Sequence, residues 1–218
     1  MLFTDPDFLL YWRALTRLGE AQVLLPAALL TALAVLRRPQ ARPLVAWWLA
    51  LLSAAALLTT ATKVAFFGWG IGWPELNFTG VSGHTMFAAA VYPVLFGTLA
   101  SGAPRTGRLL AIAGGCSLAL LIGVSRMMVG AHSLSEVVAG CLVGGTVSAL
   151  VLTAGHLPRT LVGPVLPVIV VVWLGLMPAH APASTTHSAV IRLSLKLSGN
   201  SVPYTRSEML RGLAYTPR

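Results

Sequence analysis

Six long apolar runs determine what this chain can fold into. They cover roughly residues 18–36, 44–62, 84–100, 109–124, 137–153 and 161–179. A helix needs about 20 residues to cross the hydrocarbon core of a bilayer, within a range of about 17–25. The 218 residues are 56% hydrophobic and only 10% charged, whereas a soluble domain carries about 25% charged residues. These features predict a polytopic membrane protein.

We therefore expect an all-α fold, a membrane helix bundle of about six transmembrane helices that forms one domain over residues 1–179. Residues 6–17 precede the first apolar run and mix Phe8, Tyr11 and Trp12 with polar side chains. That mixture is typical of a helix that lies in the membrane interface. An N-terminal interfacial helix is thus predicted ahead of the bundle.

Residues 180–218 are predicted to form a short extracytoplasmic tail. Within residues 191–198, apolar side chains alternate with polar ones. A period of two indicates a strand with one apolar face. The expectation is a short amphipathic strand, and a disordered tail is the alternative.

Arginines between the apolar runs predict how the helices are oriented. The chain has a net charge of +9, and cytoplasmic loops of membrane proteins are enriched in Lys and Arg. The other loops and both chain ends would then face the periplasmic side of a bacterial-type inner (plasma) membrane. No basic stripe interleaved with aromatic residues is present, so nucleic acid is not an expected partner. The arginines that predict cytoplasmic loops are Arg37, Arg38, Arg42, Arg105, Arg108 and Arg159.

Ionisable residues at membrane depth are costly, and they mark functional sites by default. One such group is Ser125-Arg126, followed after five residues by His132 and then by Glu136. His132 and Glu136 are four residues apart, so on a helix they share a face. A carboxylate that accepts a proton from one imidazole nitrogen leaves the other nitrogen free as a nucleophile. Arg126 can donate two hydrogen bonds to phosphate oxygens.

A second group lies at the start of the third apolar run. Ser82 can cap a helix, Gly83 lets the backbone approach a ligand closely, and the helix N-terminus favours an anion. His84 would stand beside that anion as a proton donor. Lys63 ends the second apolar run on the same predicted side of the membrane. Together these residues suit phosphoryl transfer.

These residues resemble the membrane branch of the type 2 phosphatidic acid phosphatase family, whose superfamily includes the vanadium haloperoxidases. The family pattern is a Lys with an Arg-Pro pair, then Pro-Ser-Gly-His, then Ser-Arg-x5-His-x3-Asp. The third motif matches in spacing, with Glu136 in place of Asp, and the second matches except that Val81 replaces Pro. In the first motif Lys63 is present, but no arginine precedes Pro74. The resemblance spans about residues 60–155.

The resemblance implies a metal-independent, cofactor-free phosphatase acting on a membrane lipid, such as a phospholipid or a polyprenyl phosphate. By this resemblance His132 attacks phosphorus to form a phosphohistidine, and Glu136 orients His132. His84 would protonate the leaving group and then activate water. The phosphate would be bound by Lys63, by Arg126 and by the backbone amides near Ser82 and Gly83, with a further hydrogen bond from Ser125.

Three alternatives remain at this stage. The missing first-motif arginine is compatible with an inactive relative that binds or flips phosphorylated lipids. His84, His132 and Glu136 could instead be zinc ligands, since His and carboxylate four residues apart can hold a metal. A vanadate-dependent haloperoxidase would use the same anion pocket.

Overall fold

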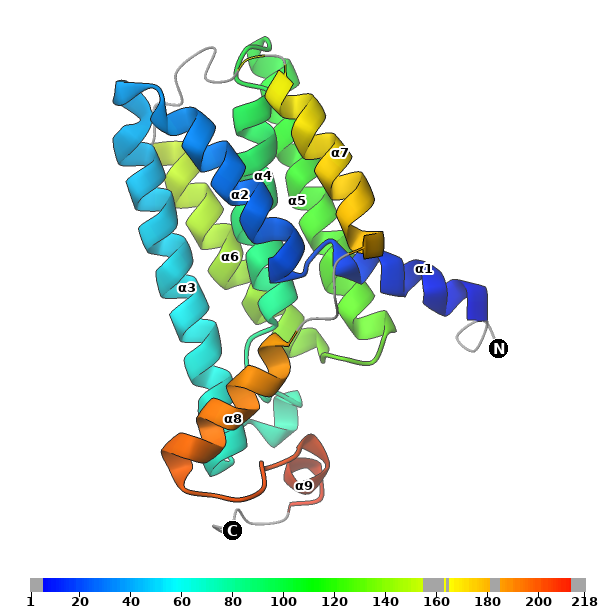
Figure 1. Ribbon diagram of the computed structural model, residues 1–218. Coiled ribbons are helices and arrows are strands. Elements are labelled where there is room, and N and C mark those ends of the chain that lie inside the picture. Colours follow the sequence, from blue (N-terminus) through cyan, green and yellow to red (C-terminus); the bar gives the residue numbers. More distant parts are fainter. Residues whose placement is uncertain (1–5, 155–162, 164, 181–184, 213–218) are drawn as a thin grey trace.

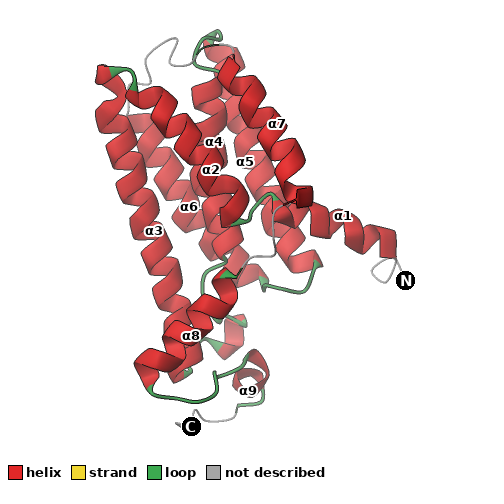
Figure 2. Ribbon diagram, viewed as in Figure 1, coloured by secondary structure: helices red, strands yellow, loops and turns green. Residues whose placement is uncertain are grey.

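The computed structural model describes residues 6–154, 163, 165–180 and 185–212, which form a bundle of helices without a strand (Figures 1 and 2). The predicted all-α fold is confirmed. The α-helices are α1 (Pro6–Arg17), α2 (Ala21–Leu36), α3 (Arg42–Trp69), α4 (Gly83–Leu99), α5 (Arg105–Met128), α6 (Leu134–Ala154), α7 (Val165–His180), α8 (Thr186–Ser198) and α9 (Arg206–Leu210). Two short 3₁₀ helices, η2 (Pro39–Ala41) and η3 (Pro74–Leu76), lie before and after α3.

Three helical segments of the described chain are long and apolar enough to cross a membrane: Pro39–Trp69, Arg105–Met128 and Leu134–Thr153. Gly83–Leu99 and Val165–Pro178 are shorter apolar helices. Large apolar side chains such as Leu57, Leu110 and Leu142 point outward from these helices, as expected where lipid replaces water. The helices indicate a membrane protein, while the number of six spans stays a prediction.

Helix α4 is the centre of the bundle (Figure 1), and most of its residues are buried. Neighbouring helices approach it closely because they present glycine. A methyl group added at Gly140 would lie 2.8 Å from the Ser82 carbonyl oxygen, and one at Gly115 would lie 2.6 Å from the Tyr92 carbonyl oxygen. Small residues that allow backbones to approach are typical of membrane helix interfaces. This close packing of α5 and α6 on α4 fixes the N-terminus of α4 relative to the start of α6.

The connections between helices alternate between the two ends of the bundle. The α2–α3 and α4–α5 connections lie at one end, and the α3–α4 and α5–α6 connections lie at the other, with α8 and α9 (Figure 1). The arginines at positions 37, 38, 42, 105 and 108 therefore share one end. Arg159 lies outside the described residues. A helix is present over the predicted residues 6–17, and in Figure 1 it extends sideways from the bundle; its place in the membrane interface stays a prediction.

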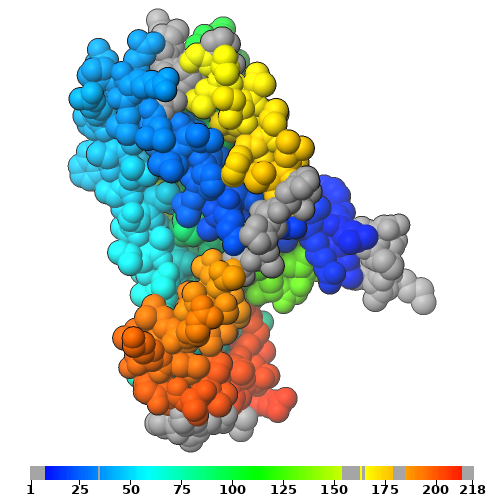
Figure 3. Space-filling view, in the orientation of Figure 1, coloured from blue at the N-terminus to red at the C-terminus, as the bar shows by residue number. Residues whose placement is uncertain are grey.

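The predicted strand in the tail is wrong, because residues 186–198 form helix α8. A lone strand leaves its backbone groups unpaired, whereas a helix satisfies them internally. The same sequence also places Val190 and Ser194 four residues apart, on a face that is buried where α8 packs on α3 (Figure 3). Gly68 of α3 permits the contact, since a methyl group there would lie 3.3 Å from the Ser194 carbonyl oxygen.

Candidate active site

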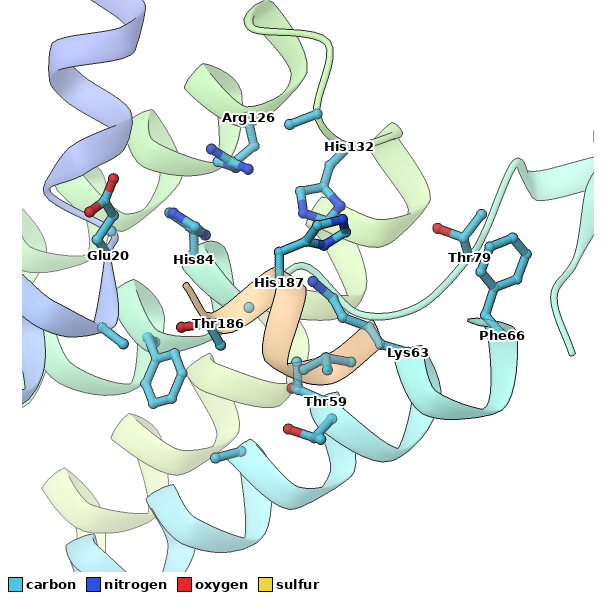
Figure 4. A pocket seen from close by; sticks show the side chains of 18 of the residues that line it. Glu20, Thr59, Lys63, Phe66, Thr79, His84, Arg126, His132, Thr186 and His187 are labelled. Atoms are coloured by element: carbon cyan, nitrogen blue, oxygen red, sulfur yellow. The ribbon is translucent and has the colours of Figure 1, made fainter. Parts of the chain in front are cut away.

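A cavity of about 820 Å³ opens at the end of the bundle that carries α8. Its wall comes from the α1–α2 junction, from α3, α4 and α5, from the α5–α6 loop, and from α8 and α9. Figure 4 shows Lys63, His84, Arg126 and His132 pointing toward a common space. The ionisable side chains that line the cavity are Glu20, Lys63, His84, Arg126, His132, His187 and Arg206.

The spacing between Arg126 and His132 is explained by the way α5 ends. Gly130 adopts a left-handed conformation with φ of 69°, which is the usual conformation of a residue just past a helix end. The backbone N–H of His132 then donates to the Arg126 carbonyl oxygen at 3.2 Å. This turn brings the His132 side chain back toward the cavity that Arg126 also lines.

His132 is hydrogen-bonded to Glu136, as the sequence predicted for residues four apart. Its Nδ1 lies 2.6 Å from Glu136 Oε2, and the Glu136 side chain is fully buried. A carboxylate can only accept, so Nδ1 carries the hydrogen and the neutral ring has its lone pair on Nε2. Burial lowers the pKa of His132 below its ordinary value, while the hydrogen bond with Glu136 opposes that shift.

Four groups besides His132 hold the Glu136 carboxylate. Thr79 donates to Oε1 from its backbone nitrogen at 2.7 Å and from its hydroxyl at 2.6 Å. The Ser133 backbone N–H donates to Oε2 at 3.3 Å. Arg206 Nη2 lies 2.7 Å from Oε1 and 2.8 Å from Oε2. Both oxygens are therefore occupied, and the carboxylate has a single defined orientation.

The guanidinium group of Arg126 has a buried nitrogen without a hydrogen-bond partner among the described residues. Its Nη1 donates to the Thr16 hydroxyl at 2.9 Å, while its Nε is buried without a hydrogen-bond partner among the described residues. The Thr59 hydroxyl on α3, which also lines the cavity, is likewise buried without a partner in the described chain. Buried polar groups are normally satisfied. These two atoms can be satisfied by a polar ligand in the cavity.

The N-terminus of α4 also faces this space. Gly83 and His84 line the cavity, and a methyl group added at Gly83 would meet only Thr59 Cγ2, at 3.8 Å. Packing therefore does not require glycine at this position. The first turn of α4 thus borders the cavity, and a helix N-terminus favours an anion.

Ser82 and Ser125, unlike the other residues predicted to bind phosphate, are not among the residues that line the cavity. Ser82 is the N-cap residue of α4, but its hydroxyl is hydrogen-bonded to the Thr85 hydroxyl at 2.9 Å. The Ser125 hydroxyl donates to the Ile122 carbonyl oxygen at 2.6 Å. Both side chains are fully buried. Neither hydroxyl is therefore free for a phosphate, and the Ser82 backbone N–H donates to the Glu136 carbonyl oxygen at 3.1 Å. Five of the eight predicted residues line the cavity, namely Lys63, Gly83, His84, Arg126 and His132. Glu136 lies behind His132.

Several residues of the site were not predicted from the sequence. Thr79 lies in the α3–α4 connection, and its distance along the chain from Glu136 gives no signal of their contact. Arg206 and His187 belong to the tail, which was interpreted as a strand or as disordered. Glu20, at the N-cap of α2, belongs to none of the predicted motifs. Burial raises the pKa of Glu20, and Arg17 and Arg126 oppose that shift.

The zinc alternative is not supported by this geometry. Within the described part of the chain, no group of three or more His, Cys, Asp or Glu side chains could hold a metal ion. His132 directs Nδ1 at Glu136, so these two side chains pair with each other.

The apolar helices indicate a membrane protein, and the cavity combines a histidine–carboxylate pair with cations that can bind an anion. Sequence comparison agrees, since residues 67–158 match the profile of the PAP2 superfamily. This segment contains His84, Arg126, His132 and Glu136, whereas Lys63 and Arg206 lie outside it. The predicted family is confirmed: the chain belongs to the PAP2 superfamily, which implies phosphatase-type activity.

The chain is also similar to a protein of Klebsiella pneumoniae described as "Uncharacterized 22.5 kDa protein in cps region". The two are 39% identical over 142 residues, which is 65% of this chain and 68% of the relative. No solved structure matches the chain.

Proposed function

We propose that this protein is an integral-membrane lipid phosphate phosphatase. It would hydrolyse a phosphomonoester or a pyrophosphate of a membrane lipid through a phosphohistidine, at the periplasmic face of a bacterial-type inner membrane. The observation that carries the proposal is the His132–Glu136 hydrogen bond of 2.6 Å beside a cavity lined by Lys63, His84 and Arg126. The domain over residues 1–179 and the tail over residues 180–218 would both contribute to the site.

In the first step, His132 Nε2 attacks phosphorus and a P–N bond forms as the bond from phosphorus to the leaving oxygen breaks. Glu136 stabilises the positive charge that develops on the ring of His132, as a carboxylate does beside a catalytic histidine. His84, in its protonated form, gives its proton to the leaving oxygen, which departs as a lipid alcohol or a lipid monophosphate.

In the second step, the roles reverse. Neutral His84 accepts a proton from a water molecule as the water oxygen attacks the phosphohistidine. The P–N bond breaks, inorganic phosphate leaves, and His132 returns to its neutral state with its hydrogen on Nδ1. His84 is protonated again, so the enzyme is ready for another cycle.

Binding of the phosphoryl group would rest on charge and on directed donors, because phosphoryl transfer depends mainly on positioning and charge stabilisation. Lys63 supplies a cation from α3, and Arg126 supplies the buried Nε that has no hydrogen-bond partner in the described chain. The backbone amides near Gly83 would add N–H donors and the favourable dipole of the α4 N-terminus. The Thr59 hydroxyl is a further donor that faces the same cavity.

A lipid substrate is favoured by the rest of the cavity wall. Its volume of about 820 Å³ exceeds what a phosphate needs, and apolar residues including Leu25, Ala56, Phe66 and Phe87 line part of it. Phosphatidic acid, phosphatidylglycerol phosphate, a polyprenyl pyrophosphate and a phosphorylated glycolipid all combine an anionic head with an apolar chain. Each is a candidate substrate.

The test is phosphate release from these four lipids by the full-length protein purified in detergent. We expect release from at least one, abolished in His132→Ala, and unchanged by a chelator. A lipid labelled with ³²P in the transferable phosphate should label the wild type after an alkaline quench, and His132→Ala should not be labelled. His187→Ala is the matched variant: this histidine also lines the cavity but has no carboxylate partner among the described residues, so labelling should persist.

Two results would overturn the proposal. Equal lipid binding by the wild type and His84→Ala without any turnover would identify a protein that binds or flips phosphorylated lipids. Activity that is lost with a chelator and restored by zinc would identify a metal enzyme.

A further inference from the structure

Arg206 reaches the candidate active site from a segment far away in the sequence. It is the first residue of α9, and its guanidinium group bridges two elements of the site. Nη2 donates to both oxygens of Glu136, at 2.7 and 2.8 Å, while Nη1 donates to the Asn77 side-chain oxygen at 2.7 Å and to the Asn77 carbonyl oxygen at 3.1 Å. Arg206 thus ties α6 to the α3–α4 connection.

Glu136 needs such a partner because its carboxylate is fully buried. A buried charge is costly unless it is paired and hydrogen-bonded. In the described structure Arg206 is the only permanently charged group in an ion pair with Glu136, since the other ion-pair partner is the titratable ring of His132. Glutamate also has one more side-chain torsion than aspartate, so its carboxylate requires more contacts to hold one orientation.

We propose that Arg206 is a positioning residue of this active site, which holds the Glu136 carboxylate in the orientation that directs His132 Nε2 into the cavity. This inference rests on the proposed function. Supporting partners of a catalytic or ligating side chain keep its geometry within narrow limits. The C-terminal segment is then part of the catalytic unit.

The tail has other attachments, so Arg206 is not needed to dock it. The Asn200 side chain donates to the Gly68 carbonyl oxygen at 2.8 Å, and the Tyr204 backbone N–H donates to the Phe67 carbonyl oxygen at 3.0 Å. The ring of Tyr204 contacts that of Phe66, and Met209 is buried. A change at Arg206 therefore acts on Glu136 without releasing α8 and α9.

Arg206 also lies outside residues 67–158, which match the superfamily profile. The profile segment contains Glu136 and His132 but not this partner. The Arg206–Glu136 contact therefore joins the profile segment to a residue outside it.

The kinetic test compares Arg206→Gln, Arg206→Lys and Arg211→Gln in the full-length protein. Arg211 lies on the same segment but is exposed, so its variant serves as the control and should match the wild type. We expect Arg206→Gln to lower kcat by roughly 10–100-fold, the range found when an outer partner of a ligating side chain is removed, with KM unchanged within about twofold. Arg206→Lys should recover part of kcat, because an ammonium can pair with Glu136 but cannot also donate to Asn77 in the same fork geometry.

Two outcomes of the kinetic test would overturn the inference. A raised KM with unchanged kcat would mean that Arg206 binds substrate instead. Additive losses in Arg206→Gln combined with Glu136→Gln would mean that Arg206 does not act through Glu136, because residues that act as one unit are non-additive. A melting temperature within a few degrees of the wild type is the check that each variant is folded.

A second measurement needs no turnover. Histidine-labelled protein in detergent is titrated by NMR, and the His132 signal is assigned by its loss in His132→Gln. If Arg206 holds Glu136 toward His132, Arg206→Gln should lower the pKa of His132, because the hydrogen bond with Glu136 raises that pKa. A raised pKa of His132 would instead mean that Arg206 acts only as a nearby cation, which would overturn the positioning role. The charged or titratable groups that act on His132 besides Arg206 are Glu136 from α6, Lys63 from α3, Arg126 from α5 and His84 from α4. His187 from α8 lines the same cavity, and all five are unchanged in the variant.

The two measurements separate the two claims. A wild type that releases no phosphate from any lipid refutes the proposed function, and the titration then still reports whether Arg206 acts on the His132–Glu136 pair. An unshifted His132 titration together with an unchanged kcat refutes the role of Arg206 and leaves the phosphatase proposal intact.

Discussion

At the scale of single residues, Glu136 organises the candidate site. Its two oxygens receive hydrogen bonds from His132, Thr79, Ser133 and Arg206. These partners come from three different parts of the chain, so one carboxylate joins the α3–α4 connection, the start of α6 and the tail. The length of the glutamate side chain matters because it must reach all of them from the first turn of α6.

Glu136→Asp should therefore lower activity, although the third motif of the family has aspartate at this position. The carboxylate would be withdrawn by one methylene and would lose contact with either His132 or the Thr79–Arg206 side. We expect kcat to fall by roughly 10-fold and Glu136→Gln to be more severe, measured as phosphate release from the best lipid substrate. Full activity in Glu136→Asp would show that the observed contacts of the glutamate are not required.

The pKa of His132 should set the acid limb of the pH dependence of kcat/KM. Only the neutral ring can attack phosphorus, and burial lowers the pKa of His132 below its ordinary value of about 6.5. The nucleophile therefore stays neutral to a lower pH than a free histidine, and the acid limb of kcat/KM should lie below pH 6.5. A limb well above that pH, in the wild type, would contradict the assignment of His132 as a buried nucleophile.

At the scale of elements, the site depends on how closely α6 packs on α4. The Ser82 backbone N–H donates to the Glu136 carbonyl oxygen at 3.1 Å, which couples the α4 N-terminus to the helix that carries the carboxylate. Glycine on α6 makes this approach possible. A methyl group at Gly144 would collide with the Met86 carbonyl oxygen, whereas one at Gly145 would meet nothing within 4 Å.

The two adjacent glycines provide a matched pair. Gly144→Ala should destabilise the bundle by about 1–3 kcal/mol, the usual effect of overpacking, and should lower activity because α6 must move away from α4. Gly145→Ala should leave stability unchanged or slightly raised, since alanine is the better helix former. Thermal unfolding in detergent and phosphate release measure both effects, and equal behaviour of the two variants would argue against the observed α4–α6 packing.

The variant Gly83→Ala tests whether the substrate approaches the backbone at the N-terminus of α4. Since a methyl group there has only an ordinary contact at 3.8 Å, Gly83→Ala should fold as well as the wild type. It would nevertheless add a methyl group at the α4 N-terminus, at a position that lines the cavity. We expect a raised KM with an unchanged melting temperature, and wild-type KM would show that no substrate atom approaches this backbone.

At the scale of the whole molecule, the alternation of the connections gives the two ends different characters. One end carries Arg37, Arg38, Arg105 and Arg108, and the other carries the cavity with α8 and α9. The excess of arginine on short connections predicts that the first end is cytoplasmic. The cavity would then open on the periplasmic side.

Cysteine labelling tests this orientation. In a background with Cys116 and Cys141 replaced by serine, Ser201→Cys places a thiol beside α8 and Gly102→Cys places one in the α4–α5 connection; both positions are exposed. A membrane-impermeant maleimide should label Ser201→Cys in cells with a permeabilised outer membrane, and Gly102→Cys only after the inner membrane is disrupted. The reverse pattern would place the cavity in the cytoplasm.

Much of the architecture follows from local sequence. The long apolar runs produce helices because a chain surrounded by lipid must satisfy its backbone hydrogen bonds within each segment. The pairing of His132 with Glu136 also follows from local sequence, since a spacing of four residues near a helix start brings the two side chains together. The tail was interpreted incorrectly because its alternation over residues 191–198 is short, and residues 190 and 194, which face α3, also have helical spacing.

The sequence by itself therefore determined that this chain forms membrane helices, and that it carries a histidine–carboxylate pair with an arginine and a second histidine nearby. Only the tertiary structure decided which side chains meet them. Thr79 and Arg206 contact Glu136 because α3, α6 and the tail pack together at one end of the bundle, and the Ser82 and Ser125 hydroxyls turn to partners in their own helices. The physical reason is that a hydrogen bond between residues distant in sequence depends on how whole helices pack, which no short-range pattern specifies.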